Sequence, residues 1–333
     1  MSETTNPREL RRQRRAELSG DPGPELPSVD MHRHSPREPG IGVVTKNERC
    51  TRSRKAAGFV RHVELDISGS QMVGKFRAGQ SFGVLPPGAD SLGRPHKVRL
   101  YSLACPTAGE DGNGAVIATT VKRTIDEHWE TGELFLGVAS NYLADLKVGD
   151  EVRITGPVGK RFLLPDRPDE HDYIFIATGT GIAPFRGMIH DLIARGVSSR
   201  IVLIMGAPYA TDLLYDDEFA ALDAERENFH YLTAISREQQ EDHPGTLYAQ
   251  DRLETHRDLI VPLLADDRAL VYVCGIAGME LGIMQKLTEI LPPERLQRYL
   301  RAEPEVLADV SNWTRQMIQR EVQPSRRVFL EVY

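Results

Sequence analysis

The chain has 333 residues, of which 40% are hydrophobic and 27% charged, with a formal net charge of −7. This length suits two domains of ordinary size, each with its own core. The acidic balance argues against nucleic-acid binding, and no apolar run is long enough to predict a membrane span. Three widely spaced cysteines predict no disulfide framework or metal site, so we expect a reducing, cytoplasmic compartment.

Residues 1–40 combine an arginine cluster, Arg11–Arg15, with several prolines between positions 22 and 39. Little in this stretch can be buried, so we expect a disordered or loosely attached extension. Docking of the arginine cluster onto an acidic partner is the alternative interpretation.

Residues 41–165 show short alternations of apolar and polar residues separated by Gly and Pro turns, which predicts a small antiparallel barrel or sandwich. Arg99 and Tyr101 share one face of a strand, and Ser102 lies on the other. Further along, Gly137–Leu143 offers small residues before a short helix that Ser140 is expected to cap. Backbone N–H groups at a helix start favour a diphosphate, although a structural role suits both stretches equally.

Residues 166–333 alternate nearly all-apolar strands with helical stretches, which predicts a doubly wound parallel sheet. The boundary falls within the polar segment Leu163–His171. Ala177–Arg186 follows a strand and opens a helix, and its two glycines allow a phosphate to approach the backbone. The same sequence also suits a plain strand–helix turn.

Ser236 and Arg237 end the third strand of this second domain, where side chains face the ligand crevice. A hydroxyl beside a guanidinium suits a phosphate monoester, and Tyr248 is placed to stack on a base. A solvated loop is the alternative for this stretch. The final stretch, Val328–Tyr333, alternates in the manner of a strand.

In order and spacing, the motifs of residues 41–333 resemble the plant-type ferredoxin–NADP reductase family: GQSFGVLPPG, GRPHKVRLYSLA, TVKR, GVASNYLADLKVGDEVRITGPVGK, ATGTGIAPFR, LLYDDEF, AISREQ, LYAQDR, VYVCGIAGMELGI and EVY. The resemblance implies an antiparallel Greek-key β-barrel that binds FAD, followed by a doubly wound parallel α/β domain that binds NADP. It implies an enzyme that moves electrons between NADPH and a ferredoxin or flavodoxin by hydride exchange at the flavin. Two alternatives are the reductase component of an oxygenase system and a non-catalytic flavin-bearing subunit.

The resemblance also implies roles for individual residues. The implied FAD contacts are Arg99, Leu100, Tyr101, Ser102, Val138, Ala139, Ser140 and Tyr333. The implied NADP contacts are Lys122, Thr180, Gly181, Pro184, Ser236, Arg237, Tyr248 and Gln250. Ser102, Cys274, Glu331 and Tyr333 are the residues implied around the reactive edge of the flavin, with the Tyr333 ring shielding one face of it.

Two positions depart from the family pattern. Ala139 replaces a cysteine of the plant members, and Thr246 stands where many members carry a Lys or Arg that supports the 2′-phosphate. Preference for NADPH is therefore expected to rest on Arg237. Trp129 or His128 is the candidate to stack on the FAD adenine, and Lys75, Arg94 and Lys97 are candidate basic contacts for an acidic carrier protein.

Overall fold

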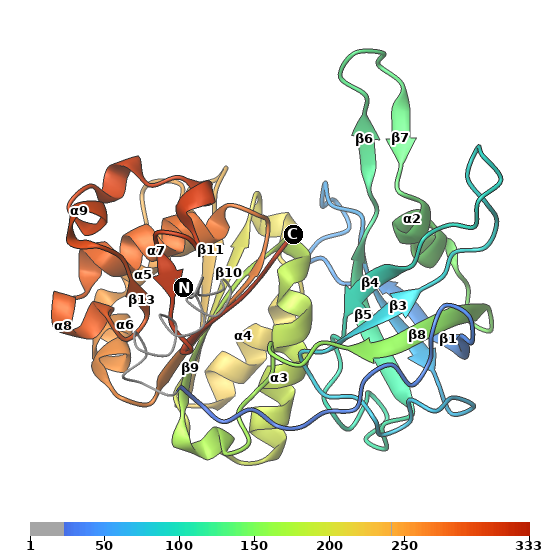
Figure 1. Cartoon of the computed structure of the whole chain (residues 1–333), viewed down its shortest axis with the longest axis horizontal. Helices are drawn as coiled ribbons and strands as arrows, with labels where there is room; N and C mark the ends of the chain where they lie inside the picture. The colour runs from blue at the N-terminus through green and yellow to red at the C-terminus, as the bar shows by residue number, and fades with distance from the viewer. Residues whose placement is uncertain (1–22, 241) are drawn as a thin grey trace, which may run out of the picture.

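The computed structural model describes residues 23–240 and 242–333. The arginine cluster Arg11–Arg15 lies outside the described residues. A mainly antiparallel domain and an α/β domain stand side by side, with strand β15 (Val328–Val332) ending at the side of the α/β domain that faces the other domain (Figure 1). In the described part of the chain, no helix has the length and apolar character needed to cross a membrane.

The first domain is a six-stranded antiparallel sheet in the order β4-β3-β8-β1-β2-β5. A bridge between Leu103, just after β4, and Thr119 in the middle of β5 brings the two edge strands together, so the sheet closes into the expected barrel. The elements are β1 (Gly40–Arg49), β2 (Val60–Asp66), β3 (Ser81–Val84), β4 (Arg99–Ser102), β5 (Val116–Lys122), β6 (Ile125–Glu127), β7 (Leu134–Leu136), α2 (Val138–Asp145) and β8 (Glu151–Val158).

The second domain is a five-stranded parallel sheet in the order β11-β10-β9-β12-β15, which is the predicted doubly wound arrangement. Its strands are β9 (Asp172–Thr178), β10 (Ile201–Ala207), β11 (Phe229–Ile235), β12 (Ala269–Gly275) and β15, with a small pair β13 (Leu300–Arg301) and β14 (Gln323–Pro324). Its helices are α3 (Ile182–Ala194), α4 (Asp216–Glu225), α5 (Arg252–Thr255), α6 (Arg257–Ala265), α7 (Met279–Ile290), α8 (Pro293–Leu296) and α9 (Pro304–Leu307).

Both faces of this sheet are covered, which explains why its strands are apolar at nearly every position. In β9, Ile174 and Ile176 pack into the core shared with α5, α6 and α7. The alternate residues Tyr173, Phe175 and Ala177 pack into the core shared with α3 and α4. Successive strand residues point to opposite faces, so a strand between two helical layers needs apolar side chains throughout.

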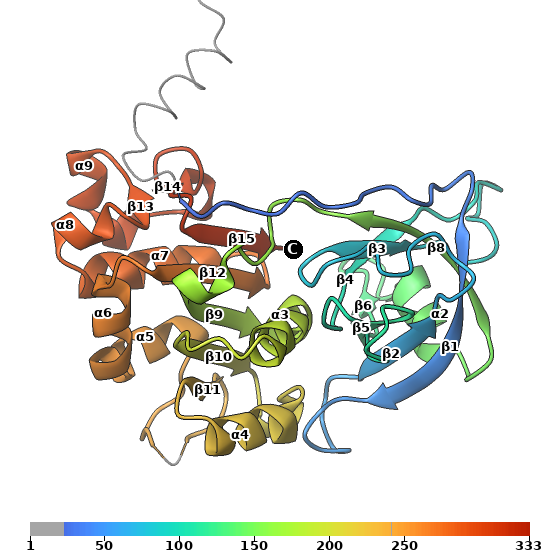
Figure 2. The ribbon, with the colours of Figure 1, turned by 90° about the horizontal axis from the view of Figure 1, so that it is seen from below.

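Residues 23–39 were expected to belong to a loosely attached extension, but they run as a strap across both domains (Figure 2). In the barrel, the His34 N–H donates to Gly156 O at 3.0 Å, and the Asp166 N–H at the domain boundary donates to Glu25 O at 3.0 Å. The low apolar content of this segment predicted loose attachment, but the segment is held by backbone hydrogen bonds, which do not require apolar side chains.

Candidate functional site

The centre of the site is the carboxyl edge of the parallel sheet, between β9 and β12. The chain leaves these two strands toward opposite sides of the sheet, and in doubly wound sheets ligands bind outside the carboxyl ends of the strands at such a switch point. The turn Gly179–Gly181 follows β9, packs against the end of β12 and also contacts β5 of the barrel. A Cβ at Gly181 would lie 2.1 Å from Cys274 O, so only glycine allows this approach.

Tyr333 lies over this turn. Its hydroxyl is 2.5 Å from Thr180 Oγ1, and its backbone N–H donates to Gly275 O at 3.0 Å. The Tyr333 side chain nevertheless stays 63% exposed. The structure thus brings together Thr180, Gly181 and Tyr333 at the end of β15, and the chain ends on the side of the α/β domain that faces the barrel (Figure 1).

Cys274 and Glu331 occupy paired positions on neighbouring strands β12 and β15. Burial raises the pKa of the Cys274 thiol, and the nearby Glu331 carboxylate adds to this shift, so Cys274 stays a neutral thiol. Glu331 Oε2 is buried and has no hydrogen-bond partner among the described residues. Burial raises the pKa of Glu331 to about 7, which lets this carboxyl hold a proton at neutral pH.

On the barrel side, β4 presents Arg99 and Leu100 to solvent and half-buries Tyr101 and Ser102. Leu100 is 60% exposed, which is unusual for a leucine in a strand of a closed barrel. Burial raises the pKa of Tyr101 to about 12, so its phenol stays neutral. Within the described residues, the Arg99 guanidinium and the Ser102 hydroxyl have no hydrogen-bond partner.

Helix α2 begins at Val138, not at Ser140, so the prediction that Ser140 caps the helix was wrong. Gly137 is the N-cap residue, and no side chain caps this helix start. The Ser140 hydroxyl instead accepts the Thr124 N–H at 3.1 Å and donates to Gly137 O at 3.2 Å. The first backbone N–H groups, from Val138 to Ser140, therefore remain open to an anion.

The hairpin β6–β7 stands out from the barrel just before α2 (Figure 1). Its strand residues are all exposed, and the apolar side chains Ile125, Leu134, Phe135 and Leu136 are between 49% and 72% exposed. Trp129 lies near the hairpin tip and is 87% exposed. His128 is held within the hairpin, since its Nδ1 accepts hydrogen bonds from the backbone N–H groups of Glu130 and Thr131, both at 3.3 Å. Stacking of either ring on an adenine stays a prediction.

A second group of predicted residues gathers at the end of β11. The Leu247 N–H donates to Ile235 O at 2.8 Å, which brings Tyr248 beside Ser236. Tyr248 is 63% exposed, Arg237 and Thr246 are exposed, and Ser236 is half-buried. This edge of the sheet therefore carries a hydroxyl, a guanidinium and an open aromatic ring.

The remaining predicted residues take surrounding positions. Lys122 is exposed at the end of β5, Pro184 is buried in the first turn of α3, and Gln250 lies against Gly282 of α7. Among the candidate basic contacts, Lys75 and Lys97 are exposed. Arg94 is already paired with Asp90 at 2.7 Å, which weakens its candidacy.

Sequence reasoning missed Arg252, which supports the loop after β11. Its side chain is 3% exposed, and its guanidinium pairs with both carboxylate oxygens of Asp242 at 2.5 and 3.0 Å. Arg252 Nε also donates to Thr233 O at 2.7 Å. No local pattern marks this role, because the partners lie on a loop and a strand that precede the helix.

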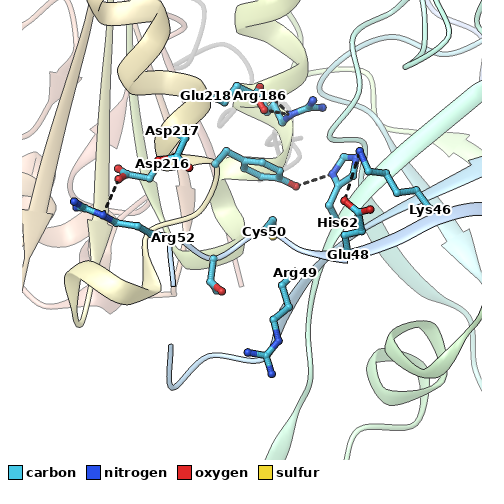
Figure 3. A pocket seen from close by; sticks show the side chains of 12 residues that line it. Lys46, Glu48, Arg49, Cys50, Arg52, His62, Arg186, Asp216, Asp217 and Glu218 are labelled. Carbon is cyan, nitrogen blue, oxygen red and sulfur yellow. Dashed lines mark hydrogen bonds and ion pairs between the residues drawn. The ribbon is translucent and has the colours of Figure 1, made fainter. Parts of the chain in front are cut away.

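Sequence reasoning also missed a polar junction between the domains, where a cavity of about 270 Å³ opens (Figure 3). The Tyr215 hydroxyl of the α/β domain lies 2.9 Å from His62 Nδ1 and 2.6 Å from Thr120 Oγ1 of the barrel. Arg186 NH1 pairs with Glu110 at 2.5 Å. None of the predicted site residues lines this cavity, so we assign it to the domain junction and not to the coenzyme site.

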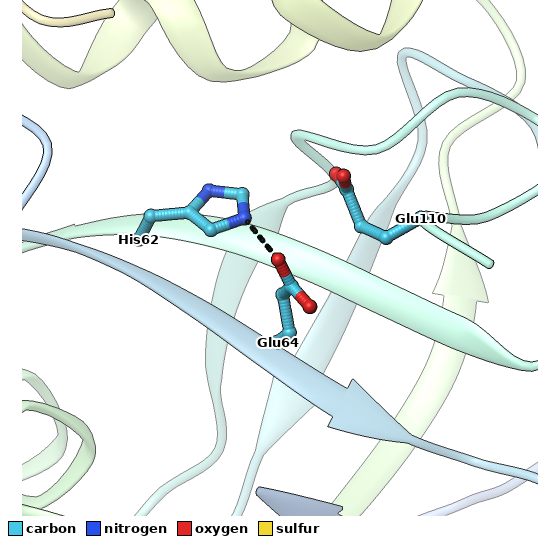
Figure 4. A group of neighbouring side chains, drawn as sticks. All are labelled: His62, Glu64 and Glu110. Carbon is cyan, nitrogen blue, oxygen red and sulfur yellow. Dashed lines mark hydrogen bonds and ion pairs between the residues drawn. The ribbon is translucent and has the colours of Figure 1, made fainter. Parts of the chain in front are cut away.

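His62, Glu64 and Glu110 in this junction are close enough to be considered as metal ligands (Figure 4). Each carboxylate already faces a cation, since Lys46 Nζ is 3.4 Å from Glu64 and Arg186 binds Glu110. These pairs neutralise the negative charge that would attract a metal ion, so the cluster is explained by the contact between the domains.

An antiparallel barrel beside a doubly wound sheet, with Thr180, Cys274, Glu331 and Tyr333 gathered at the switch point of that sheet, fits a two-domain oxidoreductase of the flavin- and nicotinamide-dependent class. Residues 175–285 match the family model described as the oxidoreductase NAD-binding domain. The ferredoxin–NADP reductase of Spirulina sp. is 40% identical over 264 residues, which cover 77% of this chain and 87% of that protein. The leaf isozyme 1 of the chloroplastic enzyme of Oryza sativa subsp. indica is 38% identical over 261 residues, which cover 77% of this chain and 70% of that protein.

The fold is also that of solved structures. The ferredoxin–NADP+ reductase of Plasmodium falciparum, solved with 2′P-AMP, superposes with a TM-score of 0.66 at 19% identity, and the match covers 91% of this chain and 99% of that chain. The chain belongs to the ferredoxin–NADP reductase family.

Proposed function

We propose that this chain is an FAD-dependent ferredoxin–NADP reductase, in which residues 41–165 bind FAD and residues 166–333 bind NADP(H). The observation that carries this proposal is the meeting of Thr180, Cys274, Glu331 and Tyr333 at the switch point of the parallel sheet, where the turn Gly179–Gly181 also contacts β5 of the barrel. The two relatives described above are both named ferredoxin–NADP reductase, and the match to this chain covers most of their length.

The residues at the barrel edge fit FAD. The uncapped start of α2 offers N–H donors from Val138, Ala139 and Ser140 to a diphosphate, and Arg99 supplies a guanidinium without a partner in the described chain. Leu100 and Val138 are exposed apolar side chains that a bound ring system would cover. FAD held by these residues would supply the hydride and one-electron chemistry that links NADPH to a one-electron carrier.

Several side chains are placed to serve that chemistry. We assign the Tyr101 phenol and the Tyr333 ring to shielding the flavin from water, with Thr180 holding the Tyr333 hydroxyl. The Ser102 hydroxyl is assigned as a hydrogen-bond donor beside the flavin. Glu331, with a pKa of about 7, can hold or release a proton at Oε2 near neutral pH.

For the coenzyme, we assign Gly181 and Pro184 to the approach of the nicotinamide nucleotide to the sheet edge, with Lys122 and Gln250 at its sides. Ser236 and Arg237 bind the 2′-phosphate, and Tyr248 stacks on the adenine. Support comes from the shared position of Ser236, Arg237 and Tyr248 at the end of β11.

Ferredoxin is the partner we propose, with flavodoxin as a second carrier of the same kind. Supply of electrons to an oxygenase component remains the competing proposal. The exposed Lys75 and Lys97 favour an acidic carrier. We also infer a reducing, cytoplasmic compartment, since Cys50, Cys105 and Cys274 are all free thiols.

The test starts with the purified protein, from which the flavin is released and identified by chromatography. FAD is expected, because two groups, Arg99 and the start of α2, suit a diphosphate; FMN alone would contradict the assignment. NADPH-dependent reduction of ferricyanide then separates an enzyme from a non-catalytic subunit. Comparing ferredoxin, flavodoxin and an oxygenase component as acceptors identifies the carrier.

A further inference from the structure

The segments that follow β10 and β11 continue side by side beyond the ends of these strands. The Ser236 N–H donates to Ala207 O and the Arg237 N–H donates to Pro208 O, both at 3.0 Å. Glu238 completes this contact, since its carboxylate accepts the Ala210 N–H at 2.7 Å. The backbone at Arg237 is therefore fixed against residues 207–210.

The side chain of Arg237 rests on an aromatic ring of this neighbouring segment. Its guanidinium carbon lies 5.8 Å from the centroid of the Tyr209 ring. A cation at this distance over an aromatic face is attracted by the negative face of the ring. Tyr209 is half-buried and so has a restricted position, whereas Arg237 is exposed and would otherwise sample many rotamers.

The donors of this guanidinium stay available. Across residues 23–240 and 242–333, no carboxylate forms an ion pair with Arg237, and the adjacent Glu238 is bound to Ala210. Arg237 is also the only arginine between positions 236 and 248, a stretch without lysine, and Thr246 is uncharged. A phosphate bound at Ser236 in this loop thus depends on one correctly placed arginine.

We propose that Tyr209 is a positioning residue for coenzyme specificity, whose ring holds the Arg237 guanidinium where it meets the 2′-phosphate of NADP(H). This inference rests on the proposed role of Ser236 and Arg237. Tyr209 acts through Arg237 and does not itself bind the phosphate. Preorganisation of the arginine lowers the entropy lost when the phosphate binds.

The size of the effect follows from the contact. A cation–π pair at an exposed site corresponds to about a two- to fivefold change in an equilibrium constant. Replacing Tyr209 by Leu should therefore weaken binding of 2′-phospho-AMP by about two- to fivefold, whereas AMP, which lacks the 2′-phosphate, should bind as before. Tyr209→Phe keeps the ring and should behave as the wild type.

The experiment is calorimetric titration of the full-length holoprotein with 2′-phospho-AMP and with AMP, for Tyr209→Leu, Tyr209→Phe, Arg237→Ala and the double variant Tyr209→Leu/Arg237→Ala. The leucine substitution should cost affinity for 2′-phospho-AMP in the wild type and nothing further in the Arg237→Ala background. A loss for AMP of the same size would instead indicate a general structural role.

Two further results would also overturn the inference. If Tyr209→Leu binds 2′-phospho-AMP as tightly as the wild type while Arg237→Ala binds it weakly, the coenzyme site stands and the role of Tyr209 is wrong. If Arg237→Ala itself binds 2′-phospho-AMP normally, the proposed 2′-phosphate site fails and the role of Tyr209 falls with it.

Discussion

Compared with the wild type, the Glu331→Gln variant should gain stability as the pH rises. The reason is that the wild-type carboxyl must ionise in a buried place at high pH, whereas the amide of the variant does not ionise. Burial raises the pKa of Glu331 from 4.5 to about 7. Unfolding therefore releases a proton between these two pH values, and the free energy of unfolding falls as the pH rises through this window. The pKa of Glu331 rises from 4.5 to about 7, and each pKa unit corresponds to roughly 1.36 kcal/mol. Above pH 7, the wild type therefore loses about 3 kcal/mol of its free energy of unfolding to the ionisation of this carboxyl.

The assay is urea unfolding of the holoprotein for the wild type and Glu331→Gln at several pH values from about 5 to about 8. The buried amide of the variant costs about 1–3 kcal/mol if it finds no partner, but this cost does not change with pH. The difference between the two proteins should thus shift in favour of the variant by about 3 kcal/mol as the pH rises.

Glu321→Gln serves as the matched control, because it makes the same chemical change at an exposed position. If the free energies of unfolding of Glu331→Gln and the wild type differ by the same amount at all pH values, the pKa of Glu331 is not raised by folding. This result would mean that Glu331 is equally ionised in the folded and unfolded states and that its carboxylate is well solvated or paired.

Three further predictions concern the coenzyme and the carrier. Tyr333→Ser should bind NADP⁺ more tightly and turn over more slowly, since the ring no longer competes with the nicotinamide; an unchanged flavin spectrum and affinity on titration would contradict this. Arg237→Ala should raise the KM for NADPH and leave kcat nearly unchanged, because the 2′-phosphate is bound equally in ground and transition states; steady-state kinetics with NADPH and NADH measure this, and equal use of both by the wild type would count against it. The KM for ferredoxin should rise with salt if Lys75 and Lys97 contact an acidic carrier, whereas a salt-independent KM would indicate an apolar interface.

The parallel sheet was predictable from the sequence because its strands carry their own signal. The unbroken apolar run Tyr173–Ala177 in β9 indicates burial on both faces, and Ala177–Arg186 marks the turn at its end without any knowledge of distant residues. The barrel was visible as short alternating strands, although its closure through Leu103 and Thr119 depends on a contact between separate segments.

Features that depend on partners far along the chain escaped prediction. Ser140 has the right residue type for a helix cap, but its hydroxyl is engaged by Thr124, so the helix starts earlier. Tyr209 and Arg237 are 28 positions apart in the sequence, so no periodic pattern of residues predicts their contact. The same holds for the strap, whose hydrogen bonds come from backbone N–H and C=O groups that do not distinguish one residue type from another.

We expect this chain to pass electrons from NADPH through its flavin to ferredoxin. The most direct test is anaerobic mixing of the purified holoprotein with NADPH and then with oxidised ferredoxin, while the flavin absorbance is followed. NADPH is expected to bleach the flavin faster than NADH does, and ferredoxin is expected to restore the oxidised spectrum as it becomes reduced. A flavin that NADPH does not bleach, or that stays reduced when ferredoxin is added, would contradict it.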